Sequence, residues 1–198
     1  VIDLETVATT VDSAGAGILA PDPYEFAAKY HRLQAALYRA GGEALYSTAP
    51  VQGTRATSCP VGRDAVIVAP DGVLSSCYLP AEHCQTQGQD CAIGCVGQGN
   101  IRISMPQAER LRGLIHRKQR CRRCFCRWSC AGGCHVNQTY PDCSLDYSPF
   151  CLQTRVITAA NLLTRLGFDS WVERFLADTA EMEHMAEQAS DRLEHTFL

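Results

Sequence analysis

The residues of this sequence with the clearest chemical potential are its cysteines. There are twelve of them, and all fall between Cys59 and Cys151. The densest group has two, five and three residues between successive members and comprises Cys121, Cys124, Cys130 and Cys134. Thiolates two or three residues apart can point into one small volume, because a tight turn brings their side chains together. That is the local requirement for chelating iron or zinc, so the spacing predicts a metal centre.

Three further cysteines extend this group at longer range. Cys59 is followed after twelve residues by Gly72, and four more residues separate Gly72 from Cys77. Sixteen residues separate Cys134 from Cys151, which lies just before a predicted helix. Cys77 lies at the end of the returning strand of a predicted β-hairpin. We therefore expect the hairpin to hold the Cys77 thiol rigidly.

Three kinds of cysteine chemistry compete at this stage: iron–sulfur clusters, zinc sites and disulfides. Disulfides are typical of short secreted chains. The sequence contains nothing that resembles a signal peptide and no apolar run long enough to span a membrane. We expect a reducing, cytoplasmic compartment, where dense cysteines usually bind metal. A structural or interaction module with zinc in four-cysteine sites stays open as the alternative, because zinc also accepts such pairs.

Charge and composition limit the partners of the chain. The 198 residues are 46% apolar, which is enough for a packed core, and the net charge of −3 argues against a whole-chain nucleic-acid binder. We expect neither nucleic acid nor membrane as a partner. Eight of the 18 Lys and Arg residues nevertheless lie between Arg110 and Arg127, around the cysteine group. They form either a solvated basic face or a source of positive charge that lowers thiolate pKa values.

Capping and turn signals predict the elements on the N-terminal side of the cysteines. Asp22 and Glu25 make a capping box for a helix that starts at Pro23 and ends at Gly41. Its expected apolar face comprises Phe26, Tyr30, Leu33 and Leu37. Short strands are predicted on either side of it, over residues 1–8 and 44–46.

The elements around the cysteines include little regular structure. A hairpin is predicted with strands at 66–68 and 73–76, followed by a long loop over 78–99 that carries Cys84, Cys91 and Cys95. Ser104 and Gln107 predict a second capping box. Residues 121–151 have little periodicity and cannot bury much apolar surface, so we expect metal ligation to hold them.

Two helices are predicted to close the chain. The first is lined by Leu152, Val156, Leu163 and Leu166 and ends at Gly167. The second is capped by Ser170 with Glu173 and runs toward residue 192.

Taken together, the seven cysteines and Gly72 resemble the seven-cysteine pattern of the SPASM domain, the C-terminal extension of a subfamily of peptide-modifying radical SAM enzymes. The stretches Cys130-Ala131-Gly132-Gly133-Cys134 and Gly99-Asn100-Ile101 also resemble that family. The match covers about half of the chain, from Cys59 to Cys151.

The resemblance implies an α+β fold. Residues 51–155 would form a small, cysteine-rich SPASM domain that contains the hairpin. Residues 1–50 would be the last βα piece of a radical SAM partial barrel with its bridging helix, and residues 156–198 would be C-terminal helices.

The resemblance also implies two auxiliary [4Fe–4S] clusters. By position in the family pattern, the ligands of auxiliary cluster I would be Cys59, Cys77 and Cys134, with Cys84, Cys91 or Cys95 as the possible fourth. Those of auxiliary cluster II would be Cys121, Cys124, Cys130 and Cys151. Cys134 would thus leave its sequence neighbours and cross to the other cluster.

The function implied by the resemblance is electron transfer, and possibly substrate binding, in an enzyme that modifies a ribosomally made peptide or protein. The CxxxCxxC motif that cleaves SAM is not found: Gln98 stands at its third place after Cys91 and Cys95, and Asn137 after Cys130 and Cys134. We expect this chain alone to be inactive in SAM cleavage. SAM and a third [4Fe–4S] cluster would belong to a missing N-terminal radical SAM core, with flavodoxin or ferredoxin as reductant.

Several residues beside the pattern stay open. Cys126 and Cys143 can be ordinary buried thiols or ligands. His83 and His135 flank cysteines and are weaker candidates for metal ligation. The catalytic residues are not predicted.

Overall fold

The computed structural model describes residues 1–3, 20–136 and 147–193, with the side chains of the last helix described to residue 188. The chain divides into two compact units. One consists of Val1–Thr54, Arg123–Cys130 and Leu145–Leu198, and the other of Arg55–Arg122 and Ala131–Ser144. The domain boundaries at residues 50 and 155 stay a prediction.

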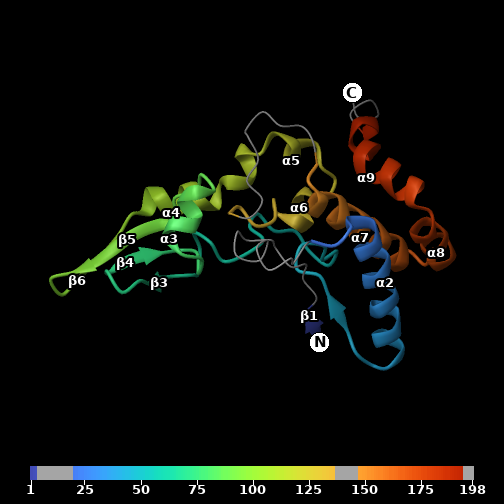
Figure 1. The fold of residues 1–198 in the computed structure, drawn as a ribbon, viewed down its shortest axis with the longest axis horizontal. Helices are drawn as coiled ribbons and strands as arrows, with labels where there is room; N and C mark the ends of the chain where they lie inside the picture. The colour runs from blue at the N-terminus through green and yellow to red at the C-terminus, as the bar shows by residue number, and fades with distance from the viewer. Residues whose placement is uncertain (4–19, 137–146, 194–198) are drawn as a thin grey trace. The chain divides into compact units, whose positions relative to one another are not determined.

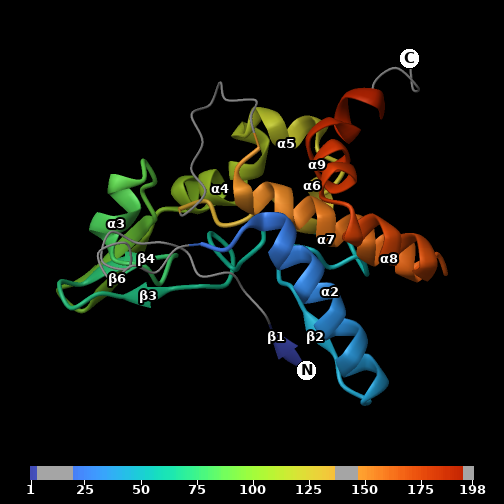
Figure 2. The same cartoon turned by 45° about the vertical axis from the view of Figure 1, so that its right-hand side comes forward.

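The first unit is built from helices. Its longer members are α2 (Pro23–Arg39), α7 (Pro149–Arg165), α8 (Asp169–Ala177) and α9 (Thr179–Leu193). Helix α2 packs along α7, and α8 and α9 pack against α7 in turn (Figures 1 and 2). The short helix α6 (Arg127–Cys130) belongs to the same unit.

Helix α2 begins where the sequence predicts. Asp22 Oδ1 accepts hydrogen bonds from the backbone N–H groups of Tyr24 at 3.0 Å and Glu25 at 2.8 Å. The capping box is only half made, because the Glu25 carboxylate pairs with Lys29 at 2.6 Å. The predicted apolar face is partly wrong: Leu33 is 42% exposed, and the fully buried side chains are mainly small or aromatic. They are Tyr24, Ala27, Ala28 and Tyr30.

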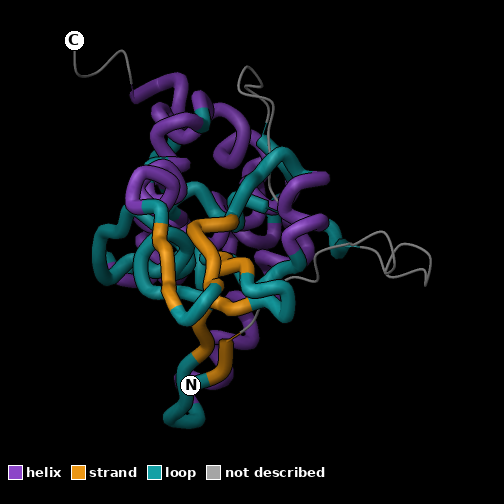
Figure 3. The backbone as a smooth tube through the Cα atoms, turned by 90° about the vertical axis from the view of Figure 1, so that its left-hand side faces the viewer, coloured by secondary structure: helices purple, strands orange, loops and turns teal. Residues whose placement is uncertain are grey.

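A small parallel strand pair flanks α2. Strand β1 (Ile2–Asp3) pairs with β2 (Ala44–Leu45) in parallel, and α2 lies between them in the chain (Figure 3). Parallel neighbours need such a crossover connection. The predicted strand at 44–46 is confirmed. The predicted strand at 1–8 is confirmed at its start, and its remainder lies outside the described residues.

The second unit contains a four-stranded antiparallel sheet in the order β3-β4-β5-β6. Its strands are β3 (Ile67–Val68), β4 (Val73–Ser75), β5 (Ala92–Gly97) and β6 (Asn100–Ile103). The hairpin of β3 and β4 is confirmed, with Gly72 at φ 83° in its turn. Mixed helix and sheet confirms the α+β class in this coarse sense.

The prediction of one long loop over 78–99 is wrong. It contains helix α3 (Ala81–Thr86) and strand β5, and β5 forms a second hairpin with β6. Gln98 and Gly99, at φ 50° and 74°, form the turn of that hairpin. Both residues have the positive φ that tight hairpin turns favour. The strand escaped prediction because Gly94 and Gly97 dilute its β propensity.

One helix packs against the sheet and continues into two shorter helical segments. Helix α4 (Met105–Arg112) contacts β5 and leads into the 3-10 helix η1 (Leu114–Arg117) and then α5 (Gln119–Arg123). Ser104 caps α4 as predicted, accepting from Gln107 N, but the Gln107 side chain donates to Asp90 O at 2.7 Å. The core of this unit comprises Val61, Leu74, Cys84, Cys91, Ile93, Ala108, Leu111, Leu114 and Val136.

The prediction for the closing helices is correct in part. Helix α7 ends before Gly167, and Val156 is buried, but Leu166 is 69% exposed. The prediction of a single second helix is wrong: the chain forms two helices, α8 and α9, which are separated at Asp178. Ser170 and Glu173 lie inside α8 and do not cap it, because Asp169 already belongs to the helix. None of the helices in the described ranges is long and apolar enough to cross a membrane.

Candidate metal centres

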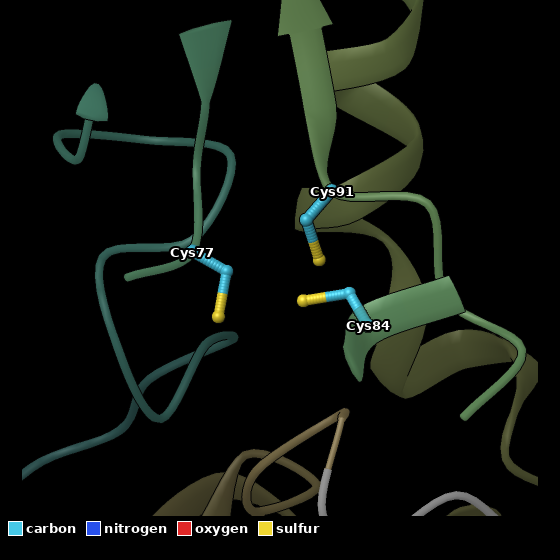
Figure 4. A group of neighbouring side chains, drawn as sticks. All are labelled: Cys77, Cys84 and Cys91. Atoms are coloured by element: carbon cyan, nitrogen blue, oxygen red, sulfur yellow. The ribbon is translucent and has the colours of Figure 1, made fainter. Parts of the chain in front are cut away.

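Three cysteines of the second unit bring their thiols together. Cys77 follows β4, Cys84 lies on α3, and Cys91 immediately precedes β5. Their sulfur atoms all lie within 4.8 Å of one another and point toward a common centre (Figure 4). Within the described residues, no other three or more His, Cys, Asp or Glu side chains meet as closely. We call Cys77, Cys84 and Cys91 the thiol trio.

The sheet explains how the trio is positioned. The Ser75 side chain accepts from Cys77 N at 3.1 Å and donates to Cys77 O at 2.8 Å, which fixes the chain as it leaves β4. The backbone N–H of Ser76 donates to Cys91 O at 2.9 Å, so the pairing of β4 with β5 sets Cys91 beside Cys77. Helix α3 then supplies Cys84, which is fully buried.

Hydrogen bonds among the thiols differentiate their acidities. The pKa of Cys77 is lowered to about 6, chiefly because the Cys91 thiol donates a hydrogen bond to its sulfur. The same bond raises the pKa of Cys91, and burial adds to that rise. Burial raises the pKa of Cys84 to about 11. The trio therefore presents one thiolate with two thiol neighbours, and a bound cation would favour deprotonation of all three.

Two more predicted ligands lie near the trio. The pKa of Cys59 is raised, first by desolvation of its sulfur, although the residue as a whole is exposed, and also by the neighbouring Cys134 and Cys77 thiols. Cys134 likewise contributes to the raised pKa of Cys84. The structure thus gathers five thiols in one region of this unit. Cys95 was also a candidate for the fourth ligand of auxiliary cluster I. It lies four residues beyond Cys91 along β5, so the two residues are about 13 Å apart along the extended strand.

Backbone geometry turns the chain between Cys130 and Cys134. Ala131, Gly132 and Gly133 all have positive φ, at 53°, 82° and 64°. Lys118 Nζ donates to Gly132 O at 2.8 Å, and Ser58 Oγ donates to Gly133 O at 2.7 Å. Glycine is the residue that adopts this conformation without strain. The two carbonyl contacts anchor the segment that delivers Cys134 to the neighbourhood of Cys59.

A second group of thiols lies in the first unit. Cys126 is 1% exposed, and its thiol donates a hydrogen bond to Cys124. Cys130 is the last residue of α6, its N–H donates to Cys126 O at 2.8 Å, and its thiol interacts electrostatically with Cys126. Burial raises the pKa of Cys126 well above its usual range. Cys126, which the sequence left open between a buried thiol and a ligand, therefore belongs to this group. We call Cys124, Cys126 and Cys130 the loop thiols.

Helix α7 presents a cation to the loop thiols. Arg155 Nη1 donates to Cys124 Sγ at 3.1 Å. The pKa of Cys124 is lowered to about 6, first by the Cys126 hydrogen bond and then by the charge of Arg155. Cys151 lies one turn earlier on α7, and residues four apart share a helix face. Ser148 Oγ caps α7 by accepting from Cys151 N at 3.3 Å.

The last of the predicted ligands is Cys121. Cys121 belongs to the second unit, on α5, where it is buried with Ile115 and Ala131. Cys143 lies outside the described residues. The eleven described cysteines are all free thiols, and none of them forms a disulfide.

The donor set fits a soft metal centre. The trio offers three thiols in a small volume, and thiolates select zinc, copper(I) and iron–sulfur clusters over hard cations. Iron–sulfur clusters are held by cysteine thiolates, while structural zinc accepts four of them. The residues present therefore fit either kind of group. The structure shows a cysteine cluster able to bind metal.

Sequence reasoning missed two features of these centres. It allowed one of Cys84, Cys91 and Cys95 as a fourth ligand, whereas two of them join Cys77. Six residues separate Cys77 from Cys84 and again Cys84 from Cys91, a regular spacing that could have indicated the trio. It also missed Arg155, whose helical position gives no signal without the contact to Cys124.

The two candidate histidines, His83 and His135, differ in burial. His83, on α3, contributes a small lowering of the Cys77 pKa. His135 is 4% exposed, and within the described part of the chain neither ring nitrogen has a hydrogen-bond partner. Burial, assisted by the charge of Lys118, lowers the pKa of His135 to about 3. His135 is therefore a neutral core residue at physiological pH.

Comparisons with known proteins do not add to these observations. A scan against protein-family models gives no match, and searches of the curated proteins and of the solved structures likewise give none. The geometry of the thiols and the spacing of the cysteines therefore carry the functional argument.

Proposed function

We propose that this chain binds two auxiliary [4Fe–4S] clusters and forms the SPASM region of a radical SAM enzyme that modifies a ribosomal peptide or protein. The observation that carries the proposal is the convergence of Cys77, Cys84 and Cys91 from three separate elements. The seven-cysteine spacing supports it independently, because it assigns Cys77 to a cluster without reference to any coordinates.

Auxiliary cluster I would be held around the trio. Cys77, Cys59 and Cys134 are the ligands that the family pattern names, and Cys84 and Cys91 are the neighbours able to complete the set. The burial of Cys84 and Cys91 would limit access of water to the cluster, and solvent exposure is one of the factors that set reduction potential.

Auxiliary cluster II would be held by Cys121, Cys124, Cys130 and Cys151. The loop thiols support this assignment, since Cys124 and Cys130 already lie close to a common neighbour, Cys126. The turn through Ala131–Gly133 supports the division of Cys130 and Cys134 between different clusters.

The parallel pair of β1 and β2 around α2 supports the assignment of residues 1–50 to the end of a radical SAM barrel. Barrels of that kind are built from repeated βα units with parallel strands. The clusters would supply one-electron chemistry, and this chain would bind them, exclude water and adjust their potentials. The reductant would be of the flavodoxin or ferredoxin class.

Optical spectroscopy tests the proposal directly. Protein purified without oxygen should be brown, with broad visible absorbance that bleaches on adding dithionite. It should release no 5′-deoxyadenosine from SAM with reductant, since the chain has no CxxxCxxC motif. Colourless protein would refute the clusters, and 5′-deoxyadenosine would refute the division of labour.

One observation favours a second function, a structural zinc module. Sulfurs bound tetrahedrally to Zn²⁺ at about 2.3 Å lie about 3.8 Å apart, which suits a trio gathered within 4.8 Å. Cys59 or Cys134 would supply the fourth thiolate. Metal analysis separates the two functions, because a zinc module would contain zinc in place of iron and would lack visible absorbance.

A further inference from the structure

Arg155 is an unusual residue of the first unit, because its charged side chain is almost completely buried. It is 1% exposed and lies in the middle of α7. Burying a charge is costly unless the surroundings hold it through hydrogen bonds or opposite charge. The contacts of its guanidinium therefore indicate what the residue is for.

The guanidinium is fixed from several directions. Its Nε donates to the backbone carbonyl of Ala186 on α9. The Tyr147 ring lies 4.2 Å from its central carbon, and the Phe125 ring lies 4.7 Å from it, so two aromatic rings hold its plane by cation–π contact. Nη1 is then directed at Cys124 Sγ, 3.1 Å away. The side chain cannot leave this sulfur without breaking the other contacts.

This arrangement stabilises negative charge on one sulfur in particular. A guanidinium stays protonated at all ordinary pH values, and its planar fork loses little freedom in forming each hydrogen bond. A hydrogen bond from a charged N–H donor is about twice as strong as a hydrogen bond between neutral groups. Hydrogen bonds to cluster sulfurs are among the factors that set the reduction potential. Adding one electron makes a thiolate-bound cluster more negative, so a fixed cation beside it favours the reduced state.

We propose that Arg155 is a positioning and tuning residue for auxiliary cluster II: it holds the Cys124 thiolate in place and raises the reduction potential of the cluster that Cys124 would bind. This inference rests on the proposed function. It concerns auxiliary cluster II, because the thiol to which Arg155 donates is that of Cys124, a residue of the same unit. The electron itself comes from the external one-electron reductant.

The test compares Arg155→Met and Arg155→Lys with a matched control, Arg165→Met. Arg165 lies on the same helix and also donates to a backbone carbonyl, that of Val51 at 3.1 Å, but at the end of α7. The anaerobically loaded proteins are titrated with dithionite and mediators while electron paramagnetic resonance follows both clusters. Iron content and far-ultraviolet circular dichroism are measured on the same samples.

The expected result is that Arg155→Met shifts one of the two midpoint potentials to a more negative value and leaves the other unchanged. Arg155→Lys should give a smaller shift in the same direction, because it keeps the charge and loses the fork. Arg165→Met should give none. Loss of half the iron in both Arg155 variants, with circular dichroism unchanged, also supports the positioning of Cys124.

Two results would overturn the inference while the proposed function stands. One is an Arg155→Met protein with full iron and both midpoints unchanged. The other is the joint loss of iron and helical circular dichroism in both Arg155 variants, since the residue would then serve the fold alone. Wild-type protein free of iron would overturn the inference together with the proposed function.

Discussion

The two groups of thiols are built in different ways. The trio comes from a strand end, a helix and a strand start, and it lies in an apolar core with Leu74 and Leu111. The loop thiols come from one short stretch, and the guanidinium of Arg155 on α7 donates to one of them, Cys124. In the trio a neighbouring thiol lowers the pKa of Cys77, whereas at Cys124 a fixed charge adds to such a bond.

This difference indicates that different parts of the fold hold the two groups of thiols in place. The trio depends on long-range strand pairing, so damage to the sheet should reach its metal. The loop thiols depend on local turns and on α7, so their metal should survive the same damage. Variants that act on one group alone can break or sharpen this comparison.

The largest effects are expected when the ligands themselves are removed. Cys77→Ala and Cys124→Ala should each lower iron and acid-labile sulfide by about half, since the two residues are assigned to different clusters, and the double variant should lose nearly all of both. Cys95→Ala is the control and should keep full iron. A single variant that retains full iron would show that its cysteine is not a ligand.

Damage to the sheet should come next. In Gly94→Ala the added Cβ would overlap the carbonyl oxygen of Arg102 on β6. We expect a loss of about 3 kcal/mol in the unfolding free energy of that unit, because backbone must shift, with selective loss of the trio's metal. Denaturant titration and iron analysis measure both.

Gly97→Ala is the matched control for the sheet. It lies on the same strand, and an added Cβ would meet nothing within 4 Å. Equal destabilisation by the two alanines would show that the overlap at Gly94 is not what disturbs the sheet. Loss of iron from both thiol groups in Gly94→Ala would show that the loop thiols also depend on the sheet.

A pH dependence of stability should follow from His135. Its pKa is lowered to about 3 in the folded chain, so below the unfolded value of 6.5 the unfolded state binds the proton and the folded state does not. Stability is therefore fully present above pH 6.5 and falls by about 1 kcal/mol by pH 5.5. Denaturant titrations at both pH values should show this loss in the wild type and not in His135→Leu. Replacing the exposed His116 in His116→Gln should leave this loss of stability unchanged.

The smallest effect is expected at the cap of α7. Ser148→Ala removes the acceptor for Cys151 N and should cost about 1 kcal/mol, without loss of iron, since no ligand changes. Ser170→Ala is the control, because Ser170 lies within α8 and caps nothing. A drop in iron on removing the cap would show that the helix start itself controls the second group.

The sequence predicted elements with local signals more successfully than those that depend on distant partners. Asp22 and Ser104 act as helix caps as expected, because a side chain accepting a neighbouring backbone N–H needs no tertiary partner. Strand β5 was missed because Gly94 and Gly97 weaken its local signal and because its pairing with β4 joins residues about twenty positions apart. Ser170 was misassigned as a cap because its residue type permits that role, while the actual chain path sets the start of α8 earlier.

The candidate site followed the same rule. Spacing alone indicated Cys77 and the loop thiols, but it could not select among Cys84, Cys91 and Cys95. That choice depends on where α3 and β5 lie, and only the folded chain shows that Cys84 and Cys91 turn toward Cys77. Arg155 was missed for the same reason, since its partner is 31 residues away in the sequence.

The central claim is that these thiols hold two iron–sulfur clusters, and metal and sulfide analysis of anaerobically purified protein tests it most directly. The account predicts about eight iron atoms and about eight labile sulfides per chain, with little zinc. Protein containing one or two zinc ions, without iron or labile sulfide, would contradict it.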